Sequence, residues 1–315
     1  MTGPAGRAPL LLVAPLLLAV AILGYLAGHR HASPPRSPPL TREASNGAAT
    51  LTYPTAWRVL AAAPAQLEGL HLTHALRLSP ASAGAGLLVG QLAGARSEPL
   101  PAAFLASLTT TPQADVVSLA GTQAYRYTHL VPARSSRSFV LYVIPDSPTA
   151  KTVALCYAPP SATQELRECE AIVARLTLLY PSSEAQAGGD LTPDPVYAQR
   201  IAAAVARADA LRVSLRAEIH AGASTAVASA AAAKLGQGLA AVAETVSTIQ
   251  PPPAAGPVQT QLLEALSSSY TAYSSLATTL RGESSPAYEA AAEQVESSEA
   301  ALSSALRNFS LIGYG

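Results

Sequence analysis

The feature that most constrains this chain is an uncharged apolar run near its start, from Ala8 to Ala27. A helix of about 20 residues rises about 30 Å, which is the thickness of the hydrocarbon core of a bilayer. Because a helix satisfies its own backbone hydrogen bonds in hydrocarbon, we expect one transmembrane helix within residues 1–28. Pro9 falls at the start of that helix, where proline is tolerated, and Tyr25 lies near its end, where an aromatic ring suits the interface.

A cleaved signal peptide is the rival explanation of this run. Arg7 supplies a short basic start, but no small-x-small cleavage site follows the apolar residues, where the chain reads Gly24-Tyr25-Leu26-Ala27. No cysteine stands there either, which argues against lipoprotein processing. We therefore favour an uncleaved anchor with the cell membrane as its partner, and leave cleavage as the alternative.

Two signals disagree about which side of the membrane holds the body. One arginine precedes the run and three follow it, at Arg30, Arg36 and Arg42, so the positive-inside rule favours a cytoplasmic body. The cysteine pair favours export, since disulfides persist in oxidising compartments. We give the cysteines more weight and expect a single-pass protein whose soluble domains are extracytoplasmic.

That cysteine pair consists of Cys156 and Cys169, the only two cysteines in the chain. Cys156 ends a predicted strand, and Cys169 lies midway along the next predicted helix. A helix that packs back on its own strand brings such residues within bridging distance, and closing a loop of this size contributes about 3 kcal/mol. The alternative is a pair of reduced, buried thiols, because cysteine also packs as a small hydrophobe.

The rest of the chain divides by composition into four parts. Residues 29–45 are rich in proline and predict an extended tether. Residues 46–180 mix strand and helix patterns, residues 181–194 form a linker rich in Ser and Gly, and residues 195–315 turn wholly helical. The predicted fold class is α+β: an N-terminal transmembrane helix, an antiparallel-sheet sandwich and an all-α antiparallel bundle.

Short runs rich in Val, Tyr and Thr predict the strands of the sandwich. They are Ala49–Tyr53, Trp57–Leu60, Leu70–Leu78, Gly86–Leu92, Val116–Leu119, Ala124–Leu130, Ser138–Ile144 and Lys151–Tyr157. The first two are interpreted as a hairpin around Pro54. A short helix is expected over Ala102–Leu108 and a longer one over Ala162–Leu178.

The segment Tyr53-Pro54-Thr55-Ala56-Trp57 resembles the Tyr-Pro-x-x-Trp opening of the PsbP/Mog1-like sandwich family. The turn at residues 119–121, the strand that follows it and the closing strand and helix are similar to that family too. The resemblance covers about 130 residues. It implies an antiparallel sheet between helices and a binding module without an active site; the family includes photosystem accessory proteins and a Ran-binding protein. Core packing alone also accounts for the tyrosine and the tryptophan.

Apolar residues recur at helical spacing in the last part and predict three or four helices. Residues 195–250 form either one long helix or two, since Gly222, Ser224 and Thr225 can end one helix and begin the next. Pro251 to Pro253 end this region, and Val258–Arg281 forms the next helix. The last helix begins at Ser284 or Ser285.

Charge and motifs exclude several functions. Lys and Arg equal Asp and Glu at 20 each, so a nucleic-acid footprint is absent. His71 and His74 are three apart on a predicted strand and are expected to face opposite sides, so we predict no metal site. No P-loop, dinucleotide fingerprint or nucleophile elbow is present, so we predict no cofactor and no catalytic residue.

Two weaker patterns concern the last helix. Glu293, Glu296 and Glu299 step along one side of it and predict a solvated acidic stripe. Asn308-Phe309-Ser310 matches a glycosylation acceptor, a frequent chance match.

The functional hypothesis is a membrane-anchored, non-catalytic protein-interaction module with an unknown protein partner and unknown binding residues. The alternative is a small-molecule or lipid carrier, which would need a contiguous apolar pocket. An enzyme ranks third, because it would need titratable groups that converge in a cleft.

Overall fold

The computed structural model describes residues 41–60, 65–67, 69–81, 84–94, 97–119, 121–147, 149–179, 190–220, 224–282 and 285–314, all within one compact unit that spans Pro39–Gly315. The expected transmembrane helix at residues 1–28 and most of the tether lie outside the described residues. Among the helices described, one is long and apolar enough to cross a bilayer, α6 (Thr225–Ser247), and the core helix of a soluble bundle meets the same criterion.

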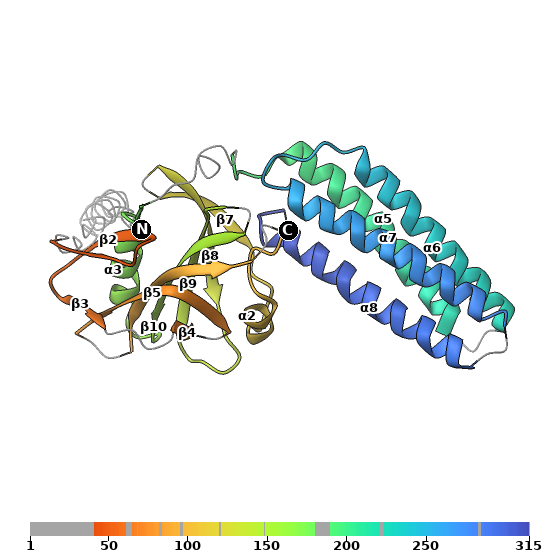
Figure 1. The fold of residues 1–315 in the computed structure, drawn as a ribbon, viewed down its shortest axis with the longest axis horizontal. Coiled ribbons are helices and arrows are strands. Elements are labelled where there is room, and N and C mark those ends of the chain that lie inside the picture. The colour runs from red at the N-terminus through yellow and green to blue at the C-terminus, as the bar shows by residue number, and fades with distance from the viewer. Residues whose placement is uncertain are drawn as a thin grey trace, which may run out of the picture. The chain divides into compact units, whose positions relative to one another are not determined.

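The first domain is built on an antiparallel sheet with strand order β3-β5-β6-β10-β9-β8-β7, in which β4 also pairs with β5 (Figure 1). Its strands are β3 (Trp57–Leu60), β4 (Ala65–Leu67), β5 (Leu70–Pro80), β6 (Gly86–Ala93), β7 (Ala114–Leu119), β8 (Thr122–Leu130), β9 (Ser138–Pro145) and β10 (Ala150–Ala158). Every strand predicted from the sequence is present, and β4 is an addition within this sheet. The antiparallel α+β prediction is confirmed.

Both faces of this sheet are buried, and each belongs to a separate apolar core. In β5, Leu70 and Leu72 belong to one core, whereas Leu76 and Leu78 belong to the other. The register shifts by one residue between Thr73 and Leu76. Because side chains alternate with a period of two, one extra residue moves all later side chains to the opposite face. This bulge lets a single strand contribute to both cores.

A second, smaller sheet and a helix cover one face of the main sheet. The smaller sheet has the order β1-β2-β11, with β1 (Arg42–Ser45), β2 (Ala49–Tyr53) and β11 (Thr177–Leu178). Helix α3 (Thr163–Val173) packs on β10 and β6 through Cys169 and Ile172. Tyr53 and Trp57 are buried in the same core, and Trp57 Nε1 donates to Glu168 Oε2 at 3.2 Å. The Tyr-Pro-x-x-Trp segment therefore serves core packing.

Three local predictions were wrong. The segments Ala49–Tyr53 and Trp57–Leu60 do not pair as a hairpin, because the turn at Pro54 carries the chain from the small sheet to the main one. Arg42–Ser45, assigned to the tether, is strand β1 and pairs with β2. The helix expected to run to Leu178 ends at Val173, because Thr177 and Leu178 complete the small sheet beside β2.

The cysteines form the expected disulfide. Cys156 on β10 and Cys169 on α3 are bonded, with their Cα atoms 5.8 Å apart, and both side chains are buried. The bond joins the helix to the centre of the sheet, and the predicted strand-then-helix geometry is confirmed.

We expect removal of this disulfide to lower the free energy of unfolding by about 3 kcal/mol, since it closes a loop of 13 residues in the unfolded chain. The measurement is chemical denaturation of the full chain in detergent, comparing Cys156→Ala/Cys169→Ala with the parent under oxidising conditions. The same comparison under reductant is the control and should show a much smaller difference. Equal stabilities in both conditions would contradict the assignment.

Helices α5 (Pro195–His220), α6, α7 (Gly256–Thr279) and α8 (Ser285–Ser310) form the second domain, an antiparallel bundle (Figure 1). The open alternative over residues 195–250 resolves as two helices. Ser224 is the N-cap of α6 and its side chain accepts from Val227 N. At Gly236 an added Cβ would lie 3.3 Å from the backbone oxygen of Tyr270, so a small residue lets α6 and α7 approach closely.

The predicted acidic stripe is wrong at one of its three positions. Glu293 and Glu296 are exposed, but Glu299 is 6% exposed and points into the bundle. Its carboxylate accepts hydrogen bonds from Tyr273 Oη at 2.7 Å and from Arg212 Nε at 2.9 Å. Spacing along α8 alone could not show this, because the burial depends on partners supplied by α5 and α7.

We expect Glu299→Ala to destabilise the protein by about 3 kcal/mol, because it leaves a partly buried guanidinium without its carboxylate. Glu296→Ala, one turn away and exposed, is the matched control and should change the free energy of unfolding by less than about 0.5 kcal/mol. Denaturant titrations of the two variants test this. Similar losses from both would show that Glu299 is not a special position.

Asn308, the candidate glycosylation acceptor, is 3% exposed, and its Nδ2 donates to Gln261 Oε1 at 2.7 Å. A glycan has no room at this position, so the motif is a chance match.

The end of the bundle contacts the sandwich. Tyr127 Oη on β8 donates a buried hydrogen bond of 2.6 Å to the backbone oxygen of Leu311, and burial raises the pKa of this phenol well above its usual value. Nearby, Asp194 N donates to Tyr314 Oη at 3.1 Å. Strand β8 is therefore fixed at Tyr127 by the C-terminal residues of the chain.

Candidate binding pocket at the bulge of strand β8

A pocket of about 540 Å³ lies where β8 departs from regular pairing with β9. The register shifts between Tyr127 and Leu130, so Thr128 and His129 form a bulge. His129 has φ +55°, a left-handed conformation that is uncommon outside glycine. Such outliers gather at functional sites, and bulges re-aim side chains there. The bulge therefore marks this region as the candidate site.

The bulge also changes which side chains of β8 share a face. Tyr127 and Leu130 are three apart but belong to the same core, because the extra residue restores their common face. Thr128 and His129, which lie between them, both line the pocket.

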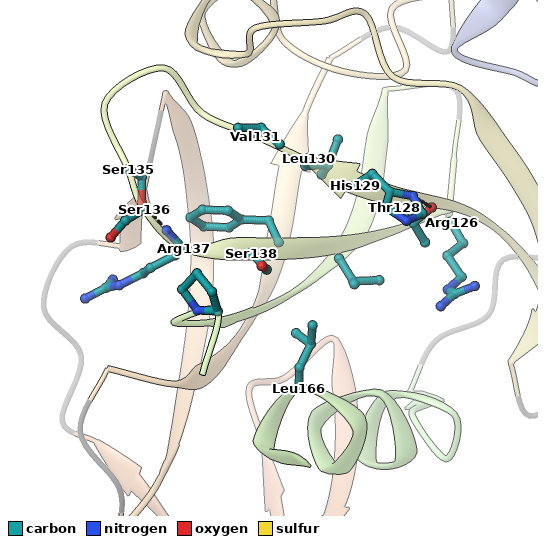
Figure 2. Close-up of a pocket in the computed structure, with 13 residues that line it drawn as sticks. Arg126, Thr128, His129, Leu130, Val131, Ser135, Ser136, Arg137, Ser138 and Leu166 are labelled. Carbon is teal, nitrogen blue, oxygen red and sulfur yellow. Dashed lines mark hydrogen bonds between the residues drawn. The ribbon is translucent and has the colours of Figure 1, made fainter. Parts of the chain in front are cut away.

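The interior of the pocket is apolar. It is lined by Leu130, Val131, Phe139, Val140, Pro160 and Leu166. Phe139 and Val140 are buried members of β9, and Leu166 reaches up from α3 (Figure 2). A mainly apolar surface with a few polar groups is the usual composition of a ligand site.

The polar groups of the pocket are basic or hydroxylic. Arg126 and Arg137 lie toward opposite ends, and His129 stands near Arg126 (Figure 2). Thr128, Ser135, Ser136 and Ser138 add hydroxyl groups. None of the described residues that line the pocket is an Asp or a Glu. The local charge is therefore positive in a chain whose net charge is zero.

The two arginines differ in their surroundings. Arg126 Nη2 lies 2.5 Å from Glu170 Oε1 on α3, and Tyr142 Oη donates to the same oxygen at 3.0 Å. Burial and the carboxylate of Glu170 together raise the pKa of Tyr142 to about 12. Arg126 is thus partly neutralised and held in place. Within the described ranges, Arg137 has no carboxylate at ion-pair distance.

A second hollow, of about 340 Å³, lies on the other side of the bulge and includes Asp115 of β7. Thr128, His129 and Leu130 line both hollows. Thr128 Oγ1 lies 3.0 Å from His129 Nδ1, which orients the imidazole. His129 therefore stands between two concave surfaces.

The bundle has a hollow of about 400 Å³ between α7 and α8, lined mainly by serine, threonine and alanine. Two of its hydroxyl groups donate to their own helices: Thr271 Oγ1 to Ser267 O at 3.1 Å and Ser298 Oγ to Val295 O at 3.0 Å. This groove follows from packing of small residues and is a weaker candidate than the pocket at β8.

A further polar cluster lies at the β9–β10 hairpin. Burial lowers the pKa of Lys151 to about 8, and its Nζ donates to the backbone oxygen of Glu98. Burial also raises the pKa of Asp146 to about 6, although Thr152 Oγ1 donates to its carboxylate at 2.5 Å. We interpret these groups as a polar end of the sheet.

The strand that holds His71 and His74 is not regular: His74 has φ +50° and lies in the bulge of β5, and both histidines are exposed. Across the described ranges, no group of three or more His, Cys, Asp or Glu side chains is arranged to hold a metal ion. His220 ends α5.

The pocket residues were not singled out by the sequence analysis. One signal was present: Tyr125, Tyr127 and Leu130 break the alternation of β8, and an alternating strand with one extra residue predicts a bulge. Arg126, His129 and Arg137 could have been proposed from that break.

The chain was compared with protein families, curated proteins and solved structures. No family model and no curated protein matches the chain. The solution structure of cyanobacterial PsbP (CyanoP) from Synechocystis sp. PCC 6803 is similar at 11% identity, over 47% of this chain and 96% of that chain, with a TM-score of 0.28. The name of that protein, PsbP, is also part of the name of the family that the Tyr-Pro-x-x-Trp segment resembles.

We expect His129→Gly to leave the free energy of unfolding unchanged or slightly higher, because glycine adopts a left-handed conformation without steric cost. His129→Val should lower it by about 1–2 kcal/mol, since a β-branched residue is strained at this φ. Thermal and denaturant unfolding measure both. Thr128→Val, the neighbouring control, should change stability by less than about 1 kcal/mol. Equal stability of the two His129 variants would contradict the strained bulge.

Proposed function

We propose that this chain is a single-pass, membrane-anchored extracytoplasmic protein and that its sandwich is a non-catalytic protein-interaction module. The pocket at the β8 bulge is the proposed contact site for the partner. The observation that carries the proposal is the combination of a buried apolar floor with basic groups at both ends.

The shape and charge of the pocket suit an extended segment of a partner protein. Val140 and Leu166, which belong to the same core, offer an apolar floor for one or two side chains. Arg126 and Arg137 flank that floor and favour acidic groups on either side. The matching ligand is a segment with apolar residues between acidic ones.

The compartment is supported by the disulfide. A bond between Cys156 and Cys169 forms and persists in an oxidising environment. The apolar run of Ala8 to Ala27 supplies the proposed anchor, and the proline-rich residues after it supply a spacer between membrane and sandwich.

A small-molecule or lipid carrier is the second candidate, favoured by the pocket volume. About 540 Å³ falls within the range of roughly 300–1,000 Å³ typical of ligand sites. An enzyme ranks third. A histidine that acts as a general base is usually oriented by a carboxylate or contacts the reacting substrate. The group at 3.0 Å from His129 Nδ1 is instead the hydroxyl of Thr128.

A photo-crosslinking amino acid at Ser136, on the exposed rim of the pocket, tests the proposal in intact membranes. We expect an adduct with a protein of discrete mass, and no such adduct from the same probe at exposed Ser303 on α8. Leu166→Lys, which places a charge against the apolar floor, should reduce the adduct by about tenfold. Val213→Lys, at a position 76% exposed on α5, is the matched control and should leave it unchanged.

An adduct of lipid mass at Ser136 that is lost in Leu166→Lys would support the carrier and contradict the interaction module. A protein adduct unaffected by Leu166→Lys would show that the partner binds elsewhere.

A further inference from the structure

Two guanidinium groups contact the ring of Tyr157 on β10. The Cζ atom of Arg77, from β5, lies 5.7 Å from the centre of the tyrosine ring, and the Cζ atom of Arg137, from the segment before β9, lies 5.4 Å from it. Arginine stacked on an aromatic ring is a common contact, and here two like charges contact the same ring.

The ring is firmly positioned. Tyr157 is 2% exposed, and its hydroxyl accepts from Arg77 Nε at 2.9 Å. Its partner in the adjacent strand is Gly86, where an added Cβ would lie 2.4 Å from Tyr157 Oη. The space that glycine leaves is therefore occupied by the tyrosine. Phe139 supports the other side, with ring centres 6.4 Å apart.

The two arginines have no acidic partner among the described residues. The ion pairs of the described chain involve Arg126, Arg212 and Arg216, and neither Arg77 nor Arg137. Arg77 is exposed and Arg137 half-buried, so both are reachable from solvent. Two unneutralised guanidiniums held on one ring create a local positive potential that a bound oxyanion would relieve.

We propose that Arg77 and Arg137 form an oxyanion site that binds carboxylates of an acidic segment in the partner protein. The inference rests on the proposed function, because Arg137 also lines the pocket at the bulge and makes the two sites continuous. The planar guanidinium matches a carboxylate through two parallel hydrogen bonds. A phosphate group shares this chemistry, and the experiment separates the two sources.

Binding of a fluorescent hexaglutamate peptide to the full chain tests this site. The chain is reconstituted in phosphatidylcholine nanodiscs at low salt, and fluorescence anisotropy gives the dissociation constant. We expect Arg77→Gln and Arg137→Gln each to weaken binding by about tenfold, as the loss of one charge-assisted contact would. Arg134→Gln removes the same charge from an exposed arginine three residues before Arg137 and should weaken binding less than about twofold.

Melting temperatures of all variants are measured alongside, so that loss of binding is compared only among folded proteins. Tyr157→Phe, which keeps the ring and removes the hydroxyl contact to Arg77, should weaken binding less than Arg77→Gln does. Equal effects from the three arginine variants would mean that the peptide is attracted by the overall positive charge and not by a specific site, and would overturn the proposal. Failure of the peptide to bind, with saturable binding of inorganic phosphate or of phosphatidylglycerol nanodiscs, would overturn the acidic-segment assignment.

The two proposals can fail separately. A protein adduct at Ser136 that persists in Arg77→Gln/Arg137→Gln would overturn the oxyanion site and leave the interaction module standing. Hexaglutamate binding that depends on both arginines, without a protein adduct at Ser136, would support the oxyanion site and contradict the pocket as the partner's contact.

Discussion

Burial of the main sheet on both faces is the constraint from which the rest of the sandwich follows. The strands β6, β9 and β10 supply side chains to both cores, and β9 and β10 are almost continuously apolar. Strands that include polar positions contribute to both cores in a different way. In β5 and β8 a bulge changes which side chains face each core, and each bulge places a histidine in the left-handed region. Packing thus creates the irregularity that the candidate site uses.

The bulge of β8 connects several features that are distant in sequence. Tyr127, at its start, binds the backbone of Leu311 at the end of the bundle. His129, two residues later, borders two hollows. Arg126, which directly precedes Tyr127, forms an ion pair with Glu170 of α3. The disulfide joins this helix to β10. A ligand in the pocket would therefore contact a strand already fixed at several points, and a preorganised site loses little conformational entropy on binding.

In the bundle, the packing of the helices has to be specified by a sequence that is rich in alanine and serine and poor in charge. Small residues permit close helix approach, as at Gly236, but they do not select which helix faces pack together. Buried polar groups make that selection. Glu299 joins α8 to Tyr273 of α7 and Arg212 of α5, and Gln259 of α7 donates to the end of α6 at Val246 O. These bonds are satisfied in one arrangement of the helices, since a shifted register would leave a buried polar group without a partner.

The sequence by itself determined most local elements: runs rich in Val, Tyr and Thr predicted the strands, Pro251 to Pro253 predicted the end of a helix, and the strand-then-helix placement of Cys156 and Cys169 favoured the disulfide. These depend on neighbours along the chain. Only the tertiary structure decided that Ala49–Tyr53 and Trp57–Leu60 enter different sheets, that Glu299 is buried, and that Arg77 and Arg137 share the ring of Tyr157. The physical reason is the same in each case: strand partners, burial and charge pairing are set by residues far away in sequence, which periodicity cannot identify.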